Sequence, residues 1–146
     1  GPEMRGGTAN CSVVVSDKPI AAPVISNPTA VIAMNYPSLA KFEHTVQPGG
    51  ALIINSSLTD AKSTRDDLTV AYVPATEIAE QVGNPKGANV VILGAYMALR
   101  PDVVKVETMI EAMKEELGPR KMKFLDGNVK ALHAGMEYVQ KNVLNA

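Results

Sequence analysis

The sequence predicts an α/β fold with a mainly parallel sheet, flanking helices and a C-terminal helical tail. Short runs rich in β-branched residues alternate with helix-like segments over roughly the first hundred residues. These runs are continuously apolar, the pattern of strands that are covered on both faces. The last third of the chain carries helical periodicity. At 146 residues the chain has the length of one domain, residues 1–146.

The predicted strands are four apolar runs bounded by turn residues: Ser12–Ser16, Thr29–Met34, Ala51–Asn55 and Leu68–Val73. Two helices are predicted between and after them. Pro37–Val46 has proline in its first turn and stops before a Pro-Gly-Gly sequence. Thr76–Val82 has Thr76 as its predicted N-cap and stops at Gly83. The polar segment Thr59–Asp67 is predicted to be a surface loop.

Three more helices are predicted in the C-terminal third. Asn89–Leu99 is apolar on nearly all sides and too short to span a membrane, so it is predicted to be a buried core helix. Lys105–Leu117 places its apolar residues on one face and ends at Gly118. The last helix, Met122–Val143, repeats apolar residues at alternating spacings of three and four. That narrow seam fits either a neighbouring subunit, such as a second copy in a homodimer, or packing within the domain.

Composition excludes several classes of function. The formal net charge is −1, with 14 basic and 15 acidic residues, and no basic stripe suits a nucleic acid. Aromatic residues make up 4%, and tryptophan is absent. No apolar run approaches the roughly 18 residues of a membrane span, and nothing resembles a signal peptide. The single cysteine can neither form an internal disulfide nor supply the about four thiolates of an iron–sulfur cluster. A reducing, cytoplasmic location fits best.

Two polar segments are candidate ligand contacts. In the first, Arg5 could bind a phosphate or carboxylate beside the backbone amides of Gly6 and Gly7, and Thr8 and Asn10 add donors. The second, Asn55-Ser56-Ser57, follows a predicted strand at its carboxyl end, where open α/β sheets bind ligands. In both segments a purely structural turn is the alternative.

No catalytic residue and no metal site is predicted. His44 and His133 are far apart in sequence and have no adjacent partner, and Cys11, just before a predicted strand, is expected to be a small core residue. The sequence has no C-x-x-C, H-E-x-x-H or G-x-S-x-G motif.

The order of the first eleven residues is a more specific signal than the chemistry of their side chains. GPEMRGGTANC, followed by an apolar run and Ser16-Asp17-Lys18-Pro19-Ile20, closely resembles the gamma subunit, or gamma domain, of 2-oxoacid:ferredoxin oxidoreductases. The resemblance continues in order over roughly the first hundred residues, through Ser26–Pro28, Met34–Leu39, Lys41-Phe42, Val46–Gly50, Asn55–Ser57, Val73–Ala79, Gly83–Pro85, Ala88-Asn89 and Leu93-Gly94. The ending Thr8–Cys11 is more similar to the 2-oxoglutarate and branched-chain types than to the pyruvate type.

The resemblance implies a Rossmann-like fold, similar to domain III of pyruvate:ferredoxin oxidoreductase. Family members begin with a strand and a glycine-rich GGQG-type loop before the GPEMRGG stretch. The sequence starts at that stretch, so this N-terminal strand and loop are expected to be missing from it.

The resemblance also implies a non-catalytic subunit of an oxidoreductase, with alpha, beta and possibly ferredoxin-like delta subunits as partners. The complex would convert a 2-oxoacid to acyl-coenzyme A and pass electrons to ferredoxin, with thiamine diphosphate, Mg and [4Fe–4S] clusters on the partners. The gamma subunit would shape the coenzyme A side of the active site, with Arg5, Gly6, Gly7, Thr8, Asn10, Asn55, Ser56 and Ser57 as its contacts. A free-standing module that binds coenzyme A or a nucleotide, and a purely structural assembly subunit, are the alternatives.

Overall fold

Three parallel strands form the sheet, in the order β1–β2–β3, in a computed structural model that describes residues 9–22 and 25–145. The strands are β1 (Ala30–Ala33), β2 (Ala51–Asn55) and β3 (Thr69–Val73). In the register, Ala30 is opposite Ala51, which is in turn opposite Thr69, so the carboxyl ends of all three strands meet at one edge of the sheet. The predicted strands at Thr29–Met34, Ala51–Asn55 and Leu68–Val73 are thus confirmed to within a residue.

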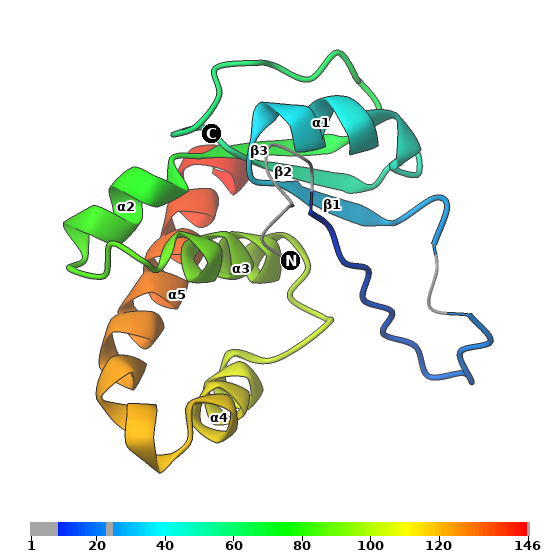
Figure 1. Cartoon of the computed structure of the whole chain (residues 1–146). Coiled ribbons are helices and arrows are strands. Elements are labelled where there is room, and N and C mark those ends of the chain that lie inside the picture. The colour runs from blue at the N-terminus through cyan, green and yellow to red at the C-terminus, as the bar shows by residue number, and fades with distance from the viewer. Residues whose placement is uncertain (1–8, 23–24, 146) are drawn as a thin grey trace, which may run out of the picture.

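The central strand β2 is buried on both faces because alternate side chains serve two separate cores. Leu52 and Ile54 pack with Leu39 of α1 (Tyr36–Phe42), which covers one face. Ala51 and Ile53 pack into a larger core on the other face. Three helices build that core: α2 (Ala75–Gln81), α3 (Ala88–Leu99) and α5 (Leu125–Val139). Figure 1 shows α1 on one side of the sheet and these three helices on the other.

The connection from β2 to β3 contains no helix and runs over the α1 side of the sheet (Figure 1). It includes the predicted surface loop Thr59–Asp67, which is held at several points. The Ser63 amide donates to Tyr72 Oη at 2.8 Å, and Lys62 Nζ lies 4.2 Å from the centre of the Tyr72 ring. Two parallel strands need a crossover of about a dozen residues, and this segment is that crossover.

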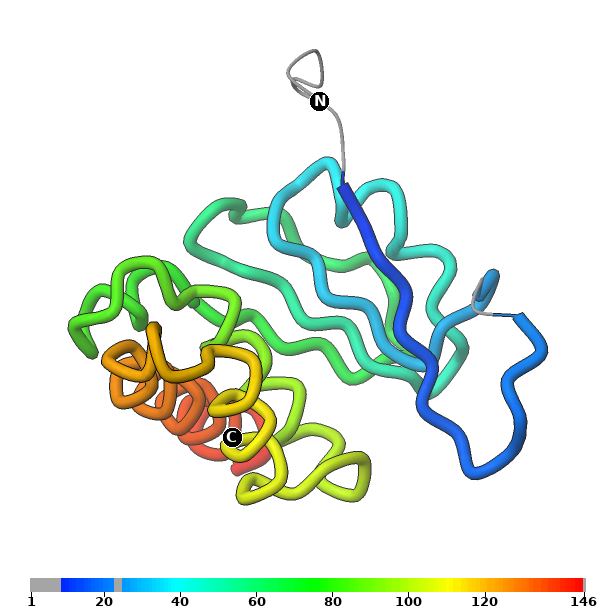
Figure 2. Tube along the Cα trace, turned by 60° about the horizontal axis from the view of Figure 1, so that its bottom comes forward, coloured from blue at the N-terminus to red at the C-terminus, as the bar shows by residue number. Residues whose placement is uncertain are grey.

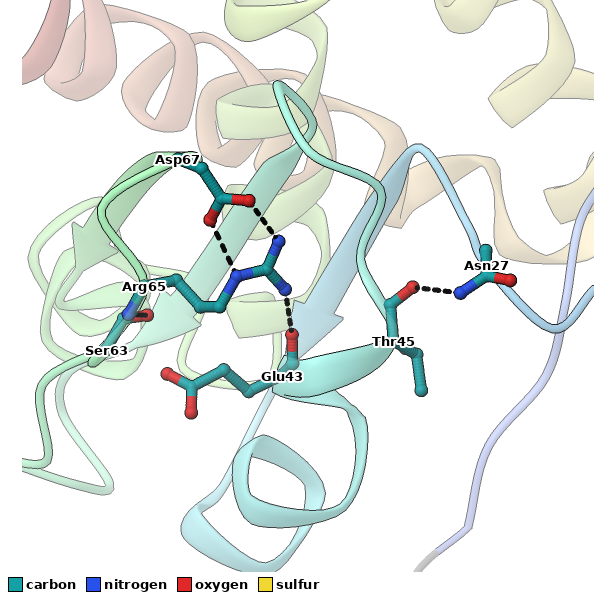
Figure 3. A network of polar contacts seen from close by, with 6 residues as sticks. All are labelled: Asn27, Glu43, Thr45, Ser63, Arg65 and Asp67. Carbon is teal, nitrogen blue, oxygen red and sulfur yellow. Dashed lines mark hydrogen bonds and ion pairs between the residues drawn. The ribbon is translucent and has the colours of Figure 1, made fainter.

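An arginine fastens the end of this crossover to the turn after α1 (Figure 3). Arg65 donates two hydrogen bonds of 2.7 Å to the Asp67 carboxylate and a third, of 3.1 Å, to the Glu43 carbonyl oxygen. The hydrogen bond from Arg65 lowers the pKa of Asp67, and the same bond raises the pKa of Arg65. The Asp67 carbonyl also accepts from Gly49, so the pair sits at the amino end of the sheet, away from the edge where the strands end.

Helices α3 and α5 cross at unusually short range because each places a glycine against the other's backbone. A Cβ on Gly94 would lie 2.9 Å from the carbonyl carbon of Leu132, and one on Gly135 would lie 2.8 Å from that of Val91. Leu132 and Val139 of α5 are fully buried in this contact region. The apolar seam predicted over Met122–Val143 therefore packs in part within the chain, on α3, whereas Met122 at its start is exposed. A homodimer through this helix stays a prediction.

Among the remaining elements, α4 matches its prediction to within a residue, whereas the others divide predicted helices. They are the 3-10 turn η1 (Glu43–Thr45), α4 (Val106–Leu117), the 3-10 helix η2 (Pro119–Phe124) and the π-helical turn η3 (Gln140–Leu144). The predicted last helix is thus divided into η2, α5 and η3. No helix in the described part of the chain is long and apolar enough to cross a membrane.

Two predictions for the N-terminal region are wrong. Ser12–Ser16 is not a strand: no backbone hydrogen bond joins it to another described residue, and Val13 and Val15 are 77% and 73% exposed. Figure 2 shows this segment as an extended trace at one margin of the molecule. Cys11, expected in the core, is exposed. An apolar β-branched run becomes a strand only where a neighbouring backbone pairs with it, and none does so here.

Candidate functional site

Asn55, the last residue of β2, is the only polar residue that is fully buried in the described part of the chain. Its side-chain oxygen accepts from the Ala75 amide at 3.1 Å and from the Ser57 amide at 3.2 Å. Its side-chain nitrogen donates to Thr76 Oγ1 at 3.2 Å. Burying an amide side chain is tolerated when it is hydrogen-bonded in this way. Asn55 therefore joins the end of β2 to the start of α2.

The start of α2 depends on residues from the neighbouring strand. Its N-cap is Pro74, whose side chain has no hydrogen-bond acceptor. The first amides of the helix therefore need acceptors from other residues. Asn55 accepts from Ala75, and Ser57 Oγ accepts from the Glu77 amide at 3.3 Å. The prediction of Thr76 as N-cap is wrong. Thr76 lies inside the first turn, because the N-cap is Pro74, two residues earlier, and the Asn55 side chain accepts from the first amide of the helix.

Two serine hydroxyls remain available next to this framework. Ser56 is half-buried, its amide donates to the Val73 carbonyl oxygen at 2.9 Å, and its hydroxyl bonds to no described residue. The Ser57 hydroxyl accepts from Glu77, and its proton donates to no acceptor in the described ranges. Both stand at the carboxyl edge of a parallel sheet, where a ligand's carbonyl or phosphate oxygen can be met. The predicted group Asn55-Ser56-Ser57 thus divides into one structural residue and two free donors.

A further polar residue, which is not among the predicted contacts, lies at this edge. Asn35 follows β1 and caps α1, accepting a 3.0 Å hydrogen bond from the Ser38 amide. Tyr36, the first residue of that helix, is exposed. The signal that could have found them is the recurrence of an asparagine at or just after the ends of two neighbouring parallel strands.

The described residues do not test whether the two predicted segments meet. Arg5, Gly6, Gly7 and Thr8 lie outside the described residues. Asn10 is exposed and forms no hydrogen bond with Asn55, Ser56 or Ser57. Whether the GPEMRGGTAN segment reaches the serine edge thus stays a prediction.

Hollows elsewhere on the surface contain none of the predicted contacts. One of about 290 Å³ lies between Asn84 and the start of α5, and a second of about 220 Å³ lies between Gly49, Gly50 and Arg100. His44 and His133 are both exposed. Among the residues that the structure describes, no three His, Cys, Asp or Glu side chains gather as a metal ion would require.

Comparison with known proteins identifies the family. The model of the pyruvate ferredoxin/flavodoxin oxidoreductase family matches residues 1–138. The chain is 36% identical, over 98% of its length, to the ketoisovalerate oxidoreductase subunit VorA of Methanothermobacter thermautotrophicus, of which it covers 29%. It is 31% identical, over 97% of its length, to the 2-oxoglutarate synthase subunit KorC of Methanothermobacter marburgensis, of which it covers 77%. The chain thus spans less than a third of VorA but most of this KorC.

Solved structures show the same fold. The gamma subunit of a keto/oxoacid ferredoxin oxidoreductase from Geobacter sulfurreducens superimposes with a TM-score of 0.74 at 26% identity, over 86% of this chain and 67% of that one. A 2-oxoglutarate:ferredoxin oxidoreductase from Magnetococcus marinus, solved with 2-oxoglutarate, coenzyme A and succinyl-CoA, gives a TM-score of 0.73 at 17% identity. It is matched over 86% of this chain and 22% of that one. By the match over residues 1–138, this chain belongs to the pyruvate ferredoxin/flavodoxin oxidoreductase family.

Proposed function

We propose that the chain is the gamma-type, non-catalytic subunit of a 2-oxoacid:ferredoxin oxidoreductase. The observation that carries the proposal is the family match over residues 1–138, together with the gamma-subunit fold of the Geobacter sulfurreducens protein. The absence of C-x-x-C, H-E-x-x-H and G-x-S-x-G motifs from the sequence agrees with a supporting role. The complex would decarboxylate a 2-oxoacid oxidatively in the cytoplasm, form an acyl-coenzyme A and reduce ferredoxin.

We infer 2-oxoglutarate as the substrate of the complex, with a branched-chain 2-oxoacid as the alternative. Relatives of both kinds are similar to this chain: KorC is a 2-oxoglutarate synthase subunit and VorA a ketoisovalerate oxidoreductase subunit. KorC supports 2-oxoglutarate more strongly, because the chain covers most of its length.

The remaining cofactors would be bound by the partner subunits. The sequence contains one cysteine, whereas a [4Fe–4S] cluster takes about four thiolates, so these 146 residues would not hold a cluster by themselves. Thiamine diphosphate with its Mg would also be held by the alpha and beta subunits, and a ferredoxin-like delta subunit would pass electrons onward. This division leaves the gamma subunit to contribute to the binding of coenzyme A.

For coenzyme A, we propose contacts at the carboxyl edge of the sheet. Ser56 and Ser57 offer hydroxyl donors that suit the phosphate and amide oxygens of this cofactor. Asn55 would not touch it, because its oxygen already accepts from Ala75 and Ser57, and its role would be to hold the serines in place. Arg5 to Asn10 would add a guanidinium and further amide donors on the cofactor side.

Co-expression with thiamine- and cluster-bearing subunits of such an oxidoreductase from the same genome tests the proposal. The expected result is a stable complex that reduces methyl viologen only when a 2-oxoacid and coenzyme A are both present. Rates with 2-oxoglutarate and 2-oxoisovalerate then decide the substrate. A chain that purifies alone and ignores these subunits would overturn the proposed function. If that lone chain binds coenzyme A calorimetrically, the free-standing binding module is the better description.

A double variant tests the coenzyme A edge within the complex. Ser56→Ala with Ser57→Ala should raise the KM for coenzyme A about tenfold, as expected from the loss of two hydrogen bonds, and leave the KM for the 2-oxoacid unchanged. The control is Ser12→Ala with Ser26→Ala, because these two serines are exposed and lie outside the edge. An unchanged KM for coenzyme A would exclude the serine contacts without affecting the subunit assignment.

A further inference from the structure

A hollow of about 220 Å³ lies at the amino end of the sheet, at the opposite end of the strands from Ser56 and Ser57. The described residues that line it are Thr29, Gln47, Pro48, Gly49, Gly50 and Arg100. Thr29 and Gly50 directly precede β1 and β2, so the hollow lies where these two strands begin. Its volume is below the roughly 300 Å³ of the smallest drug-sized ligand pockets, and it therefore suits a small group.

The turn at Gly49 and Gly50 leaves the hollow open. Gly49 has a φ of +81°, which a residue with a side chain rarely adopts. A Cβ on Gly50 would lie 2.6 Å from the Thr29 carbonyl oxygen and 2.8 Å from that of Gln47. Both carbonyl oxygens already accept, from the Ala51 and Gly50 amides respectively. A side chain is therefore disfavoured at both glycines, and this turn does not fill the hollow.

Hydrogen-bond donors line this hollow, and none of its described lining residues is acidic. Arg100 is half-buried, and its Nη1 donates to the Leu99 carbonyl oxygen at 3.1 Å. Its other N–H groups have no acceptor among the described residues, and it forms no ion pair with them. Gln47 Nε2 donates to the Asn27 carbonyl oxygen at 2.7 Å and has a second proton to donate. Thr29 adds a hydroxyl.

The end of helix α3 explains only part of this arrangement. A cation is favourable at a helix C-terminus, but the hydrogen bond to Leu99 uses one N–H of Arg100. Asp67, whose carbonyl oxygen accepts from Gly49, already binds Arg65 with both carboxylate oxygens. Donors that are shielded from water cost free energy while they remain unpaired. The guanidinium of Arg100 thus lacks an anion that the described chain does not supply.

The larger hollow, of about 290 Å³, lacks this property. Lys123 and Lys130 line it, but Asp126 lines it too and pairs with Lys130 at 3.2 Å. Both lysines are exposed to water. The positive charge of that hollow is therefore partly neutralised within the chain, whereas the charge of Arg100 is not.

We propose that the hollow beside Arg100 is a binding site for a carboxylate. The planar guanidinium binds a carboxylate through two parallel hydrogen bonds, and the Gln47 amide and the Thr29 hydroxyl can donate to the same oxygens. One cation balances one carboxylate, whereas a phosphate group would bring nearly twice that charge. The carboxylate belongs either to a free small molecule or to an acidic side chain of a protein partner. Both sources present the same group to Arg100, and the experiment separates them.

Modification of the arginines by phenylglyoxal, mapped by mass spectrometry of peptides, is the test. Arg100 should react readily in sodium chloride. Sodium acetate at the same ionic strength should slow this reaction at least about fivefold if the ligand is a free carboxylate, because the paired guanidinium is shielded from the reagent. Arg120 is the control for a free guanidinium, because it is exposed and forms no ion pair with a described residue. Arg65, which already binds Asp67, should react slowly in both salts.

The second source is tested in the co-expressed complex. If the carboxylate is a side chain of a partner, Arg100 should be protected in the complex and not by acetate. Arg100→Gln should then weaken the complex about tenfold, because a hydrogen bond between charged groups is lost. Arg100→Lys keeps the charge and should retain most of the affinity, whereas a partner that merely covers the hollow would respond equally to both variants. Circular dichroism should find both variants folded.

Protection of Arg100 neither by acetate nor in the complex would overturn the proposal. Acetate that protects Arg120 as strongly as Arg100 would do so too, because it would indicate non-specific binding of the anion. A complex that alone protects Arg100 but is affected equally by Arg100→Gln and Arg100→Lys would also contradict it. The hollow does not include Ser56 or Ser57, and assembly of the wild-type complex is measured separately, so failure of this proposal leaves the proposed function standing.

Discussion

Gly135→Ala should destabilise the protein although alanine is the better helix former. Gly135 lies in α5 where the helix crosses α3. A Cβ there would lie 2.8 Å from the carbonyl carbon of Val91 and 3.1 Å from its Cα, with the carbonyl oxygen closer still. All three atoms belong to backbone, so no side chain can rotate away to make room.

The size of the effect follows from these distances. Carbon atoms in contact prefer separations of about 3.5–4.0 Å, so the two helices would have to move apart by roughly an ångström. Overpacking of a core costs about 1–3 kcal/mol, and a backbone clash belongs at the upper end of that range. Alanine offsets up to about 1 kcal/mol through its helix propensity. The expected net loss is about 2 kcal/mol of unfolding free energy, which lowers Tm by roughly 5–8 °C.

Urea unfolding followed by circular dichroism measures this loss, with the slope m expected to stay unchanged. Gly127→Ala is a matched control in the same helix. Its Cβ would meet only the Asn84 side chain, at an ordinary 3.6 Å. That variant should be as stable as the wild type or gain up to about 1 kcal/mol. The reasoning is refuted if the Gly135 variant matches or exceeds the Gly127 variant in stability, because the close crossing would then impose no penalty.

Three further predictions concern single side chains. Asn55→Ala should cost about 1–3 kcal/mol of unfolding free energy, because it leaves the Ala75 and Ser57 amides without their acceptor. The control is Asn89→Ala, at an exposed position without a side-chain hydrogen bond, which should change the free energy of unfolding by less than about 0.5 kcal/mol in the same urea assay. Equal losses in the two variants would contradict the role of Asn55 in joining β2 to α2. The wild type should be more stable than Asp67→Asn at neutral pH. Because Arg65 lowers the pKa of Asp67 in the folded state, that advantage should be complete above the unfolded pKa of about 3.9 and disappear as the pH falls through the lower folded value. An advantage that persists in acid, measured by urea unfolding across the pH range, would show that the ion pair is not its source. Cys11 should react with Ellman's reagent in the native protein as fast as in urea, and a protected thiol would contradict its exposure.

The sequence predicted a strand correctly where the chain also contains the neighbouring strands that pair with it. Ala51–Asn55 is continuously apolar up to its last residue, and the structure covers it on both faces. The two strands beside it were predicted at Thr29–Met34 and Leu68–Val73, each bounded by turn residues. Each of them pairs with β2 in parallel register. These strands have neighbours on the chain itself, so local pattern and tertiary pairing agree.

The same local pattern failed at Ser12–Ser16. Its three valines have as much β propensity as the true strands, but propensity does not supply a pairing partner. The exposure of Val13 and Val15 and of Cys11 follows from that one missing contact. A strand forms only when two backbones pair, and the sequence of one apolar run describes only one of them.

The candidate site, too, was predictable only in part from the sequence. The position of Asn55-Ser56-Ser57 after a buried strand was enough to predict polar groups at the carboxyl edge of the sheet. It could not distinguish their roles, because both a turn and a ligand contact use Asn and Ser. Only the meeting of β2 with α2 assigns Asn55 to the cap of a helix that begins 20 residues later. Ser56 and Ser57 are then the two residues of this group whose hydroxyls can still donate to a ligand.

By itself the sequence determined the α/β class, three of the strands, the five helices and the family, because each depends on local periodicity or on ordered motifs. Tertiary structure decided which apolar faces meet. The apolar seam of α5 fits either a neighbouring subunit or its own domain, and in the structure Gly94 and Gly135 let its central part pack closely on α3. Periodicity states that a helix has an apolar face, but only the shape of the opposing surface determines what covers it.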